Sequence, residues 1–265
     1  MIFYVWYPSG GFGHYINAVI TQYGHGFTRP NKTPVFSDNG DSHDMELVAT
    51  KYFHDPEFYE FEFDPALNYC VLIDNGITNE GTKFKKFFQD NNIIKVCYSD
   101  FTWPVVANTM IVKAAKSTLQ SELAVDTDQW YSAEPWVQRE KYFLFLRDHP
   151  LRKAWKPESK YDTIMVDDLL NYNKFYNSLP LNLNNFESLH QNWWEANKQY
   201  FLPILTAQKI LKGQFEPVDD IWTQAVVYYQ IWCQYGIEVP HNDYSNWFKN
   251  YNDIVIMLDK HGIQI

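Results

Sequence analysis

Cysteine is scarce in this chain, and its few copies lie far apart. Three occur in 265 residues, at Cys70, Cys97 and Cys233. The count is odd and no Cys-x-x-Cys pair is present, which argues against a disulfide framework and against a zinc site. We therefore expect ordinary buried thiols in a reducing compartment, and we predict a cytoplasmic protein with no bound metal.

Basic stretches and long apolar runs are also lacking. The formal net charge is −10, and no basic run suits a nucleic-acid duplex, so we expect no nucleic-acid partner. No apolar run approaches the length that crosses a bilayer, and the first residues do not read as a signal peptide. We expect no membrane partner. The absence of a G-x-S-x-G elbow argues against a common class of hydrolases.

Apolar residues, by contrast, are plentiful, at 46% of the chain against 20% charged residues, so a packed core is expected. Short apolar runs alternate with stretches of helical spacing. This order predicts a three-layer α/β fold with a mostly parallel sheet and helices on both faces. We expect a single α/β domain over 1–265, with a helical portion over 186–250. Residues 137–146 and 254–258 fit either a strand or a helix. The predicted strands are 2–7, 69–73, 93–98 and 163–166.

A glycine-rich turn follows the first predicted strand and precedes a predicted helix at 15–23. It consists of Ser9, Gly10, Gly11, Phe12, Gly13, His14 and Tyr15. A strand that passes into a helix through glycines directs backbone N–H groups at the helix N-terminus, where a phosphate can bind. The turn lacks the lysine of a Walker A loop and the third glycine of the dinucleotide fingerprint. Any anion bound there must be held by backbone donors, the helix end and His14.

Several polar residues are expected near this turn because ligands of open parallel sheets lie beyond the carboxyl ends of the strands. Asp74 follows the second predicted strand, and Ser99 follows the third. His14 or Asp74 could accept a proton from a hydroxyl group. Arg147 and Arg152 lie in a basic stretch that either faces solvent or closes over an anionic ligand.

The turn from Tyr7 to His14 resembles the phosphosulfate loop of the P-loop-type sulfotransferases, a Tyr-Pro-Lys-Ser-Gly-Thr-Thr sequence. Residues 93–98 and the helix through Asn108 look like that family's 3′-phosphate element, and residues 162–179 are similar to a later strand and helix. The resemblance covers about the first two thirds of the chain. It implies transfer of a sulfonate from 3′-phosphoadenosine 5′-phosphosulfate to the hydroxyl of a small molecule or glycan. The implied donor-binding residues are Ser9, Gly10, Gly11, Phe12, Gly13, Tyr15, Ser99, Asn108, Arg147 and Arg152.

Two alternatives stay open. Ser9 to His14 also resembles the Gly-Gly-Leu-Gly-Asn turn of some fucosyltransferases, and Leu146 to His149 faintly resembles their His-x-Arg-Arg-Gly-Asp element. That resemblance implies a glycosyltransferase that uses a nucleotide sugar. The third possibility is a binding protein of the same fold without catalysis. It is suggested by the missing loop lysine and by the aromatic-rich helices after Phe186.

Overall fold

The computed structural model describes residues 1–8, 10–27, 66–73, 92–115, 133, 135–214, 218–237 and 251–264. They fall into two compact units, each built from two stretches of chain. We call residues 1–99 with 155–198 the sheet unit, and residues 100–154 with 199–265 the helical unit. The assignment of the whole chain to one domain stays a prediction.

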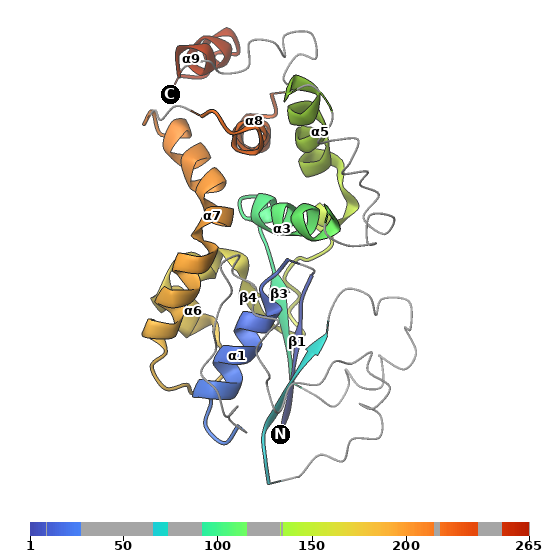
Figure 1. The fold of residues 1–265 in the computed structure, drawn as a ribbon, viewed down its shortest axis with the longest axis vertical. Helices are drawn as coiled ribbons and strands as arrows, with labels where there is room; N and C mark the ends of the chain where they lie inside the picture. Colours follow the sequence, from blue (N-terminus) through green and yellow to red (C-terminus); the bar gives the residue numbers. More distant parts are fainter. Residues whose placement is uncertain are drawn as a thin grey trace. The chain divides into compact units, whose positions relative to one another are not determined.

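The sheet unit contains four parallel strands in the order β2-β1-β3-β4 (Figure 1). β1 and β2 are short and continuously apolar, as expected of buried parallel strands, whereas β3 contains Lys95 and β4 begins at the exposed Asp162. The prediction of an α/β fold with a parallel sheet is confirmed. The strands are β1 (Ile2–Trp6), β2 (Tyr69–Ile73), β3 (Asn92–Cys97) and β4 (Asp162–Met165).

The strand order creates a switch point between β1 and β3. The chain leaves β1 to form β2 on one side, and then crosses to form β3 on the other side of β1. β1 and β3 pair in register, with Trp6 opposite Lys95 near the carboxyl end. In open α/β sheets, the crevice outside the carboxyl ends at such a point is the usual ligand site. The glycine turn directly follows β1, so it lies at this edge.

Helix α1 (Gly13–Tyr23) packs on β1 and β2, and its buried residues include Ile16 and Ile20. Asn17 is fully buried on this helix, but its amide donates to the Cys70 carbonyl at 3.0 Å, which avoids the cost of an unsatisfied polar group. Past β4 the chain forms η5 (Val166–Leu170) and α6 (Tyr172–Ser178). The rings of Tyr15 on α1 and Phe175 on α6 lie 5.6 Å apart, so the two helices are neighbours against the sheet.

Helix α7 (Glu187–Leu211) runs without interruption from the sheet unit into the helical unit. Pro203 lies inside this helix, although a proline would be expected to break it. A proline removes one helical hydrogen bond and crowds the preceding turn. Here Pro203 is buried together with Phe201 and Ile204, and burial of these apolar side chains offsets that cost.

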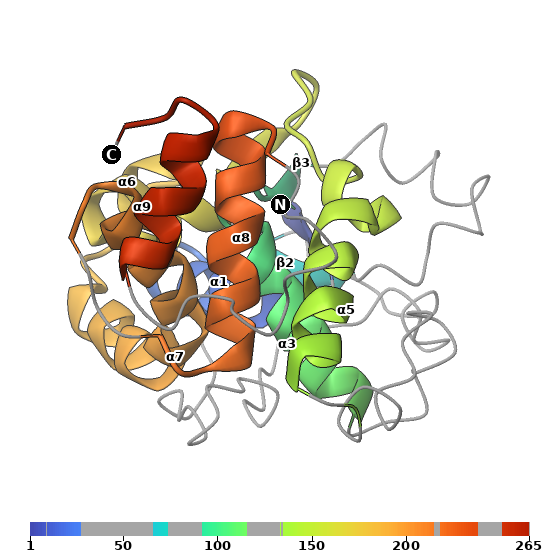
Figure 2. The same ribbon diagram turned by 90° about the horizontal axis from the view of Figure 1, so that it is seen from above.

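The helical unit contains α3 (Trp103–Ala115), α5 (Pro135–Asp148), η4 (Pro150–Lys153), α8 (Ile221–Tyr235) and α9 (Tyr251–Lys260). Helices α5 and α8 lie side by side (Figure 2), with the rings of Tyr142 and Trp222 in edge-to-face contact at 5.1 Å. Trp103 is fully buried and donates from its indole N–H to the Leu146 carbonyl at 2.8 Å. Residues 137–146 and 254–258, whose sequences fit either a strand or a helix, are both helical.

No helix within the described ranges combines the length and the apolar character needed to cross a membrane.

Candidate functional site

The glycine turn is a tight reversal between β1 and α1. The Gly11 N–H donates to the Pro8 carbonyl at 2.8 Å, and Gly10 adopts a φ of 79°. Phe12 also lies in the left-handed region, with φ 60° and ψ 25°, directly before the first residue of α1. A left-handed conformation costs a non-glycine residue about 1–2 kcal/mol. Such strained positions gather at ligand sites, which makes the turn a candidate site on its backbone geometry alone.

Two glycines of the turn are required by close packing. A Cβ atom on Gly13 would lie 2.2 Å from the ring of Tyr7, and one on Gly11 would lie 2.8 Å from the Pro8 ring. Gly10, Gly11 and Gly13 are buried. The Phe12 ring meets Trp193 of α7 edge to face at 5.3 Å, and this contact helps to hold the strained residue in place. The turn is therefore fixed by its neighbours before any ligand binds.

The N-terminus of α1 has the features of an anion site. Phe12 at the N-cap makes no side-chain hydrogen bond to the helix, and the first turn of α1 contains no acidic residue. The first N–H groups of a helix carry a partial positive charge and accept an anion well. Burial of the turn lowers the local dielectric constant, which strengthens such an interaction. The arrangement suits a phosphate or sulfate group held by backbone donors.

His14 and Tyr15 differ in their surroundings. His14 is 7% exposed and its ring lies edge-on to that of Tyr7 at 5.9 Å; its role as a base or a ligand contact stays a prediction. Tyr15 is 1% exposed and stacks on Trp193 at 4.5 Å. Its hydroxyl shares a hydrogen bond of 2.8 Å with Nδ1 of His190. The structure thus places Tyr15 in an aromatic cluster that supports the turn.

His190 is a buried residue that the sequence did not single out. Its ring lies within 6.1 Å, centroid to centroid, of four aromatic rings, and burial lowers its pKa to about 4. The imidazole is therefore neutral at pH 7. The pKa of Tyr15 is raised, first by burial and then by Tyr23 and Tyr172. Only the tertiary fold brings α1, α6 and α7 together here. The four rings belong to Tyr15, Tyr172, Phe175 and Trp193.

Ser99 lies at the predicted edge of the sheet, but its polar groups contact a carboxylate. The Ser99 hydroxyl donates to Oδ1 of Asp167 at 2.6 Å, and its backbone N–H donates to Oδ2 at 3.3 Å. Asp167 follows β4, the strand next to β3. Asp168 accepts the Met165 N–H at 3.2 Å, and its pKa is raised, chiefly by burial. Two carboxylates thus follow β4, and the sequence did not predict that Ser99 pairs with one of them.

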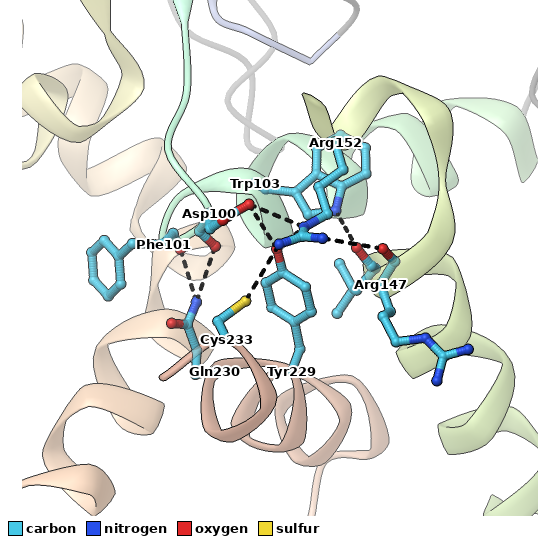
Figure 3. A network of polar contacts seen from close by, with 9 residues as sticks. Asp100, Phe101, Trp103, Arg147, Arg152, Tyr229, Gln230 and Cys233 are labelled. Atoms are coloured by element: carbon cyan, nitrogen blue, oxygen red, sulfur yellow. Dashed lines mark hydrogen bonds and ion pairs between the residues drawn. The ribbon is translucent and has the colours of Figure 1, made fainter. Parts of the chain in front are cut away.

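Arg147, Arg152 and Asn108 lie in the helical unit. Arg152 donates from Nε to the Tyr229 hydroxyl at 2.9 Å and forms an ion pair with Asp100 at 3.0 Å (Figure 3). Its guanidinium also lies 4.6 Å from the centre of the Trp232 ring. In Figure 3 the charged end of Arg147 points away from this network, and it pairs with Asp148 at 2.6 Å. Both predicted anion ligands therefore have carboxylate partners within their own unit.

Lys95 is a second buried polar feature of the sheet unit. Its ammonium group donates to Glu158 at 2.5 Å and to the Lys156 carbonyl at 3.0 Å. It also lies 5.0 Å from the centre of the Trp6 ring. The side chain of Lys95 is 3% exposed, whereas that of Glu158 is 41% exposed. This ion pair attaches the segment after Trp155 to the sheet.

Glu158→Gln should lower the free energy of unfolding by about 1–2 kcal/mol, because it leaves a buried ammonium without its counter-charge. The effect is below that of a fully buried pair since Glu158 is partly exposed. Urea denaturation would measure it. Lys160→Gln is the control, because Lys160 contacts the same carboxylate from the solvent side and its loss should change nothing measurable. Equal stability of Glu158→Gln and wild type would show that the pair contributes nothing.

Two predicted site residues, Ser9 and Asp74, lie outside the described residues. The pKa of Cys97 is raised to about 11 by burial, and burial also raises that of Cys70, so neither thiol suits nucleophilic catalysis. In the part of the chain that the structure describes, no three His, Cys, Asp or Glu residues gather as metal ligands would.

Comparison with protein-family models, curated proteins and solved structures finds no significant match to this chain.

Proposed function

We propose that the protein is a sulfotransferase-like enzyme that moves a sulfonate from a nucleoside phosphosulfate to a hydroxyl acceptor. One observation carries the proposal: the strained, buried turn from Pro8 to Gly13 meets an uncapped helix N-terminus at the switch point of a parallel sheet. These features together suit a ligand whose phosphate and sulfate groups are bound by backbone N–H groups.

The residues of the turn would act mainly by position and charge. The backbone from Phe12 to His14 would hold the phosphosulfate, and its N–H groups would stabilise the charge that develops during transfer. A bond forms between the acceptor oxygen and sulfur as the bond from sulfur to the phosphate oxygen breaks. His14 or Asp74 would take the proton that the hydroxyl loses. His14 borders the turn and is the first of the two to test.

Isothermal titration calorimetry tests the proposal with adenosine 5′-phosphosulfate, adenosine 3′,5′-bisphosphate and the diphosphates of adenosine, uridine and guanosine. We expect the wild type to bind a sulfated or bisphosphorylated adenosine ligand. Gly11→Val should weaken that binding at least about tenfold, because a side chain at Gly11 meets Pro8 and displaces the backbone donors.

Gly236→Val is the matched control. Gly236 has a positive φ, of 68°, and no atom lies within 4 Å of a Cβ placed there, so this variant has backbone strain without the steric contact expected at Gly11. The Gly236→Val variant should lose some stability through backbone strain and bind as the wild type does. Preference for a uridine or guanosine diphosphate would favour the glycosyltransferase alternative. If no nucleotide binds, the proposal is refuted, and the alternative that stays open is a binding protein of the same fold without catalysis.

A further inference from the structure

Phe12 sets the direction of the backbone groups at the start of α1. Its φ of 60° and ψ of 25° place it in the left-handed region. Its carbonyl accepts the Ile16 N–H at 3.1 Å, so this residue also begins the hydrogen bonding of the helix. The ψ angle of Phe12 orients the peptide unit that joins it to Gly13. A move to another allowed region would therefore turn the Phe12 carbonyl away from Ile16 and redirect the Gly13 N–H.

A phenylalanine does not hold this conformation by its own preference. Contact between Cβ and the backbone disfavours the left-handed region by a factor of roughly five to thirty. Without support from its neighbours, Phe12 would occupy the region in about one molecule in ten. Its ring lies edge to face against Trp193 at 5.3 Å, an arrangement that stabilises aromatic pairs beyond their buried area. This contact ties the side chain of Phe12 to α7.

Trp193 can serve as a support because its own ring is fixed. It is fully buried, and it stacks on Tyr15 of α1 at 4.5 Å with 12° between the ring planes. It also stacks on His190, which precedes it on α7, at 5.5 Å. The Tyr15 hydroxyl shares a 2.8 Å hydrogen bond with His190, so the two rings that contact Trp193 also hold each other.

We infer that Trp193 is a positioning residue of the proposed anion site: it keeps Phe12 left-handed, and through Phe12 it keeps the Gly13 N–H in its ligand-binding direction. The inference rests on the proposed function for the ligand, whereas the conformational step can be measured without one. If only the left-handed conformation binds, the measured affinity is the intrinsic affinity multiplied by the fraction of molecules in that conformation.

Trp193→Leu should weaken the binding of adenosine 5′-phosphosulfate about tenfold in calorimetry on the full chain, because the left-handed fraction falls to about one tenth. In the Phe12→Gly background the same substitution should change the affinity less than about twofold, since glycine enters the left-handed region without steric cost and needs no support. A general loss of packing would weaken binding equally in both backgrounds, so the two comparisons separate positioning from stability.

Trp103→Leu is the matched control. Trp103 is also fully buried, but it belongs to the helical unit. Its replacement should lower the free energy of unfolding through lost packing and leave the affinity for adenosine 5′-phosphosulfate as in wild type.

Amide hydrogen exchange followed by NMR tests the conformational step without a ligand. Exchange of the Ile16 N–H, relative to that of Ile20 farther along α1, should be at least about tenfold faster in Trp193→Leu than in wild type, because its acceptor on Phe12 turns away. With Phe12→Gly present, Trp193→Leu should leave this ratio unchanged.

An equal loss of affinity in both backgrounds, or unchanged binding and exchange in Trp193→Leu, would overturn the inference and leave the proposed function standing. Failure of the wild type to bind any nucleotide would refute the proposed function. The exchange ratio at Ile16 would then decide the role of Trp193: an increase in Trp193→Leu supports its hold on Phe12, and an unchanged ratio overturns it.

Discussion

Gly13→Ala is expected to destabilise the protein by about 2–3 kcal/mol and to abolish the ligand binding that we propose for the glycine turn. The added methyl group would lie 2.2–2.6 Å from three atoms of the Tyr7 ring, a separation that real Cβ atoms do not show. Tyr7 is itself buried and follows β1, so its ring cannot move without displacing the end of the central strand. Denaturation curves and calorimetry with adenosine 5′-phosphosulfate would measure the two effects.

Gly236→Ala separates the crowding at Gly13 from the general cost of replacing a glycine. Gly236 ends α8 with a φ of 68°, and a Cβ there meets nothing within 4 Å. Its replacement should cost about 1 kcal/mol through backbone strain alone and leave ligand binding intact. If Gly13→Ala were at least as stable as Gly236→Ala, the Tyr7 ring would have to move aside for the added methyl group. Packing would then not fix the turn.

The free energy of unfolding is expected to fall by up to about 3 kcal/mol as the pH drops from 6.5 to 4, through His190 alone. Burial lowers the pKa of this histidine to about 4 in the folded protein, against 6.5 for an ordinary histidine. Between these values the unfolded chain binds a proton that the folded protein does not. The stability contributed by neutral His190 is therefore fully present above pH 6.5 and lost progressively below it.

Replacement of His190 and Tyr15 together by phenylalanine isolates this effect. Removing both partners of the 2.8 Å hydrogen bond avoids leaving one of them unsatisfied in the core. The variant should lose stability less steeply than wild type between pH 6.5 and 4, as measured by urea denaturation at each pH. His261→Gln, at an exposed position near the C-terminus, should follow the wild-type curve. Parallel curves for the double variant and wild type would contradict the prediction.

The local sequence pattern was sufficient to predict where the strands of the sheet lie. The apolar run 69–73 coincides with β2, and the predicted strand 163–166 differs from β4 by one residue at each end. Buried parallel strands are short and continuously apolar, so their signal is contained in the strand itself. The aromatic run 142–146 fitted either structure, and only packing on α8 selects the helix. The helix through Pro203 likewise depends on burial that local propensity does not report.

The sequence predicts the position of the glycine turn, but not its backbone conformation or its long-range contacts. Glycines between a strand and a helix located the turn at Gly10 to Gly13. No local rule assigns a left-handed conformation to Phe12, because a bulky residue disfavours it; contact with Trp193, far along the chain, helps to hold it. The pairing of Ser99 with Asp167 and the engagement of Arg152 by Asp100 also depend on long-range packing. The sequence therefore did not predict that Ser99 and Arg152 each have a carboxylate partner.

The division of each unit between two stretches of chain has a consequence for how the protein is made. The ribosome produces β1 first, yet Phe3 pairs with Cys70 on one side and Asn92 on the other, and the edge strand β4 begins at Asp162. Closing such long loops is slow, because their entropic cost precedes the contacts that offset it. The central strand β1 therefore cannot pair on both sides until β3 has been synthesised. A gene fragment ending before Asp162 would encode neither unit in full, so neither unit can be completed before that point of synthesis.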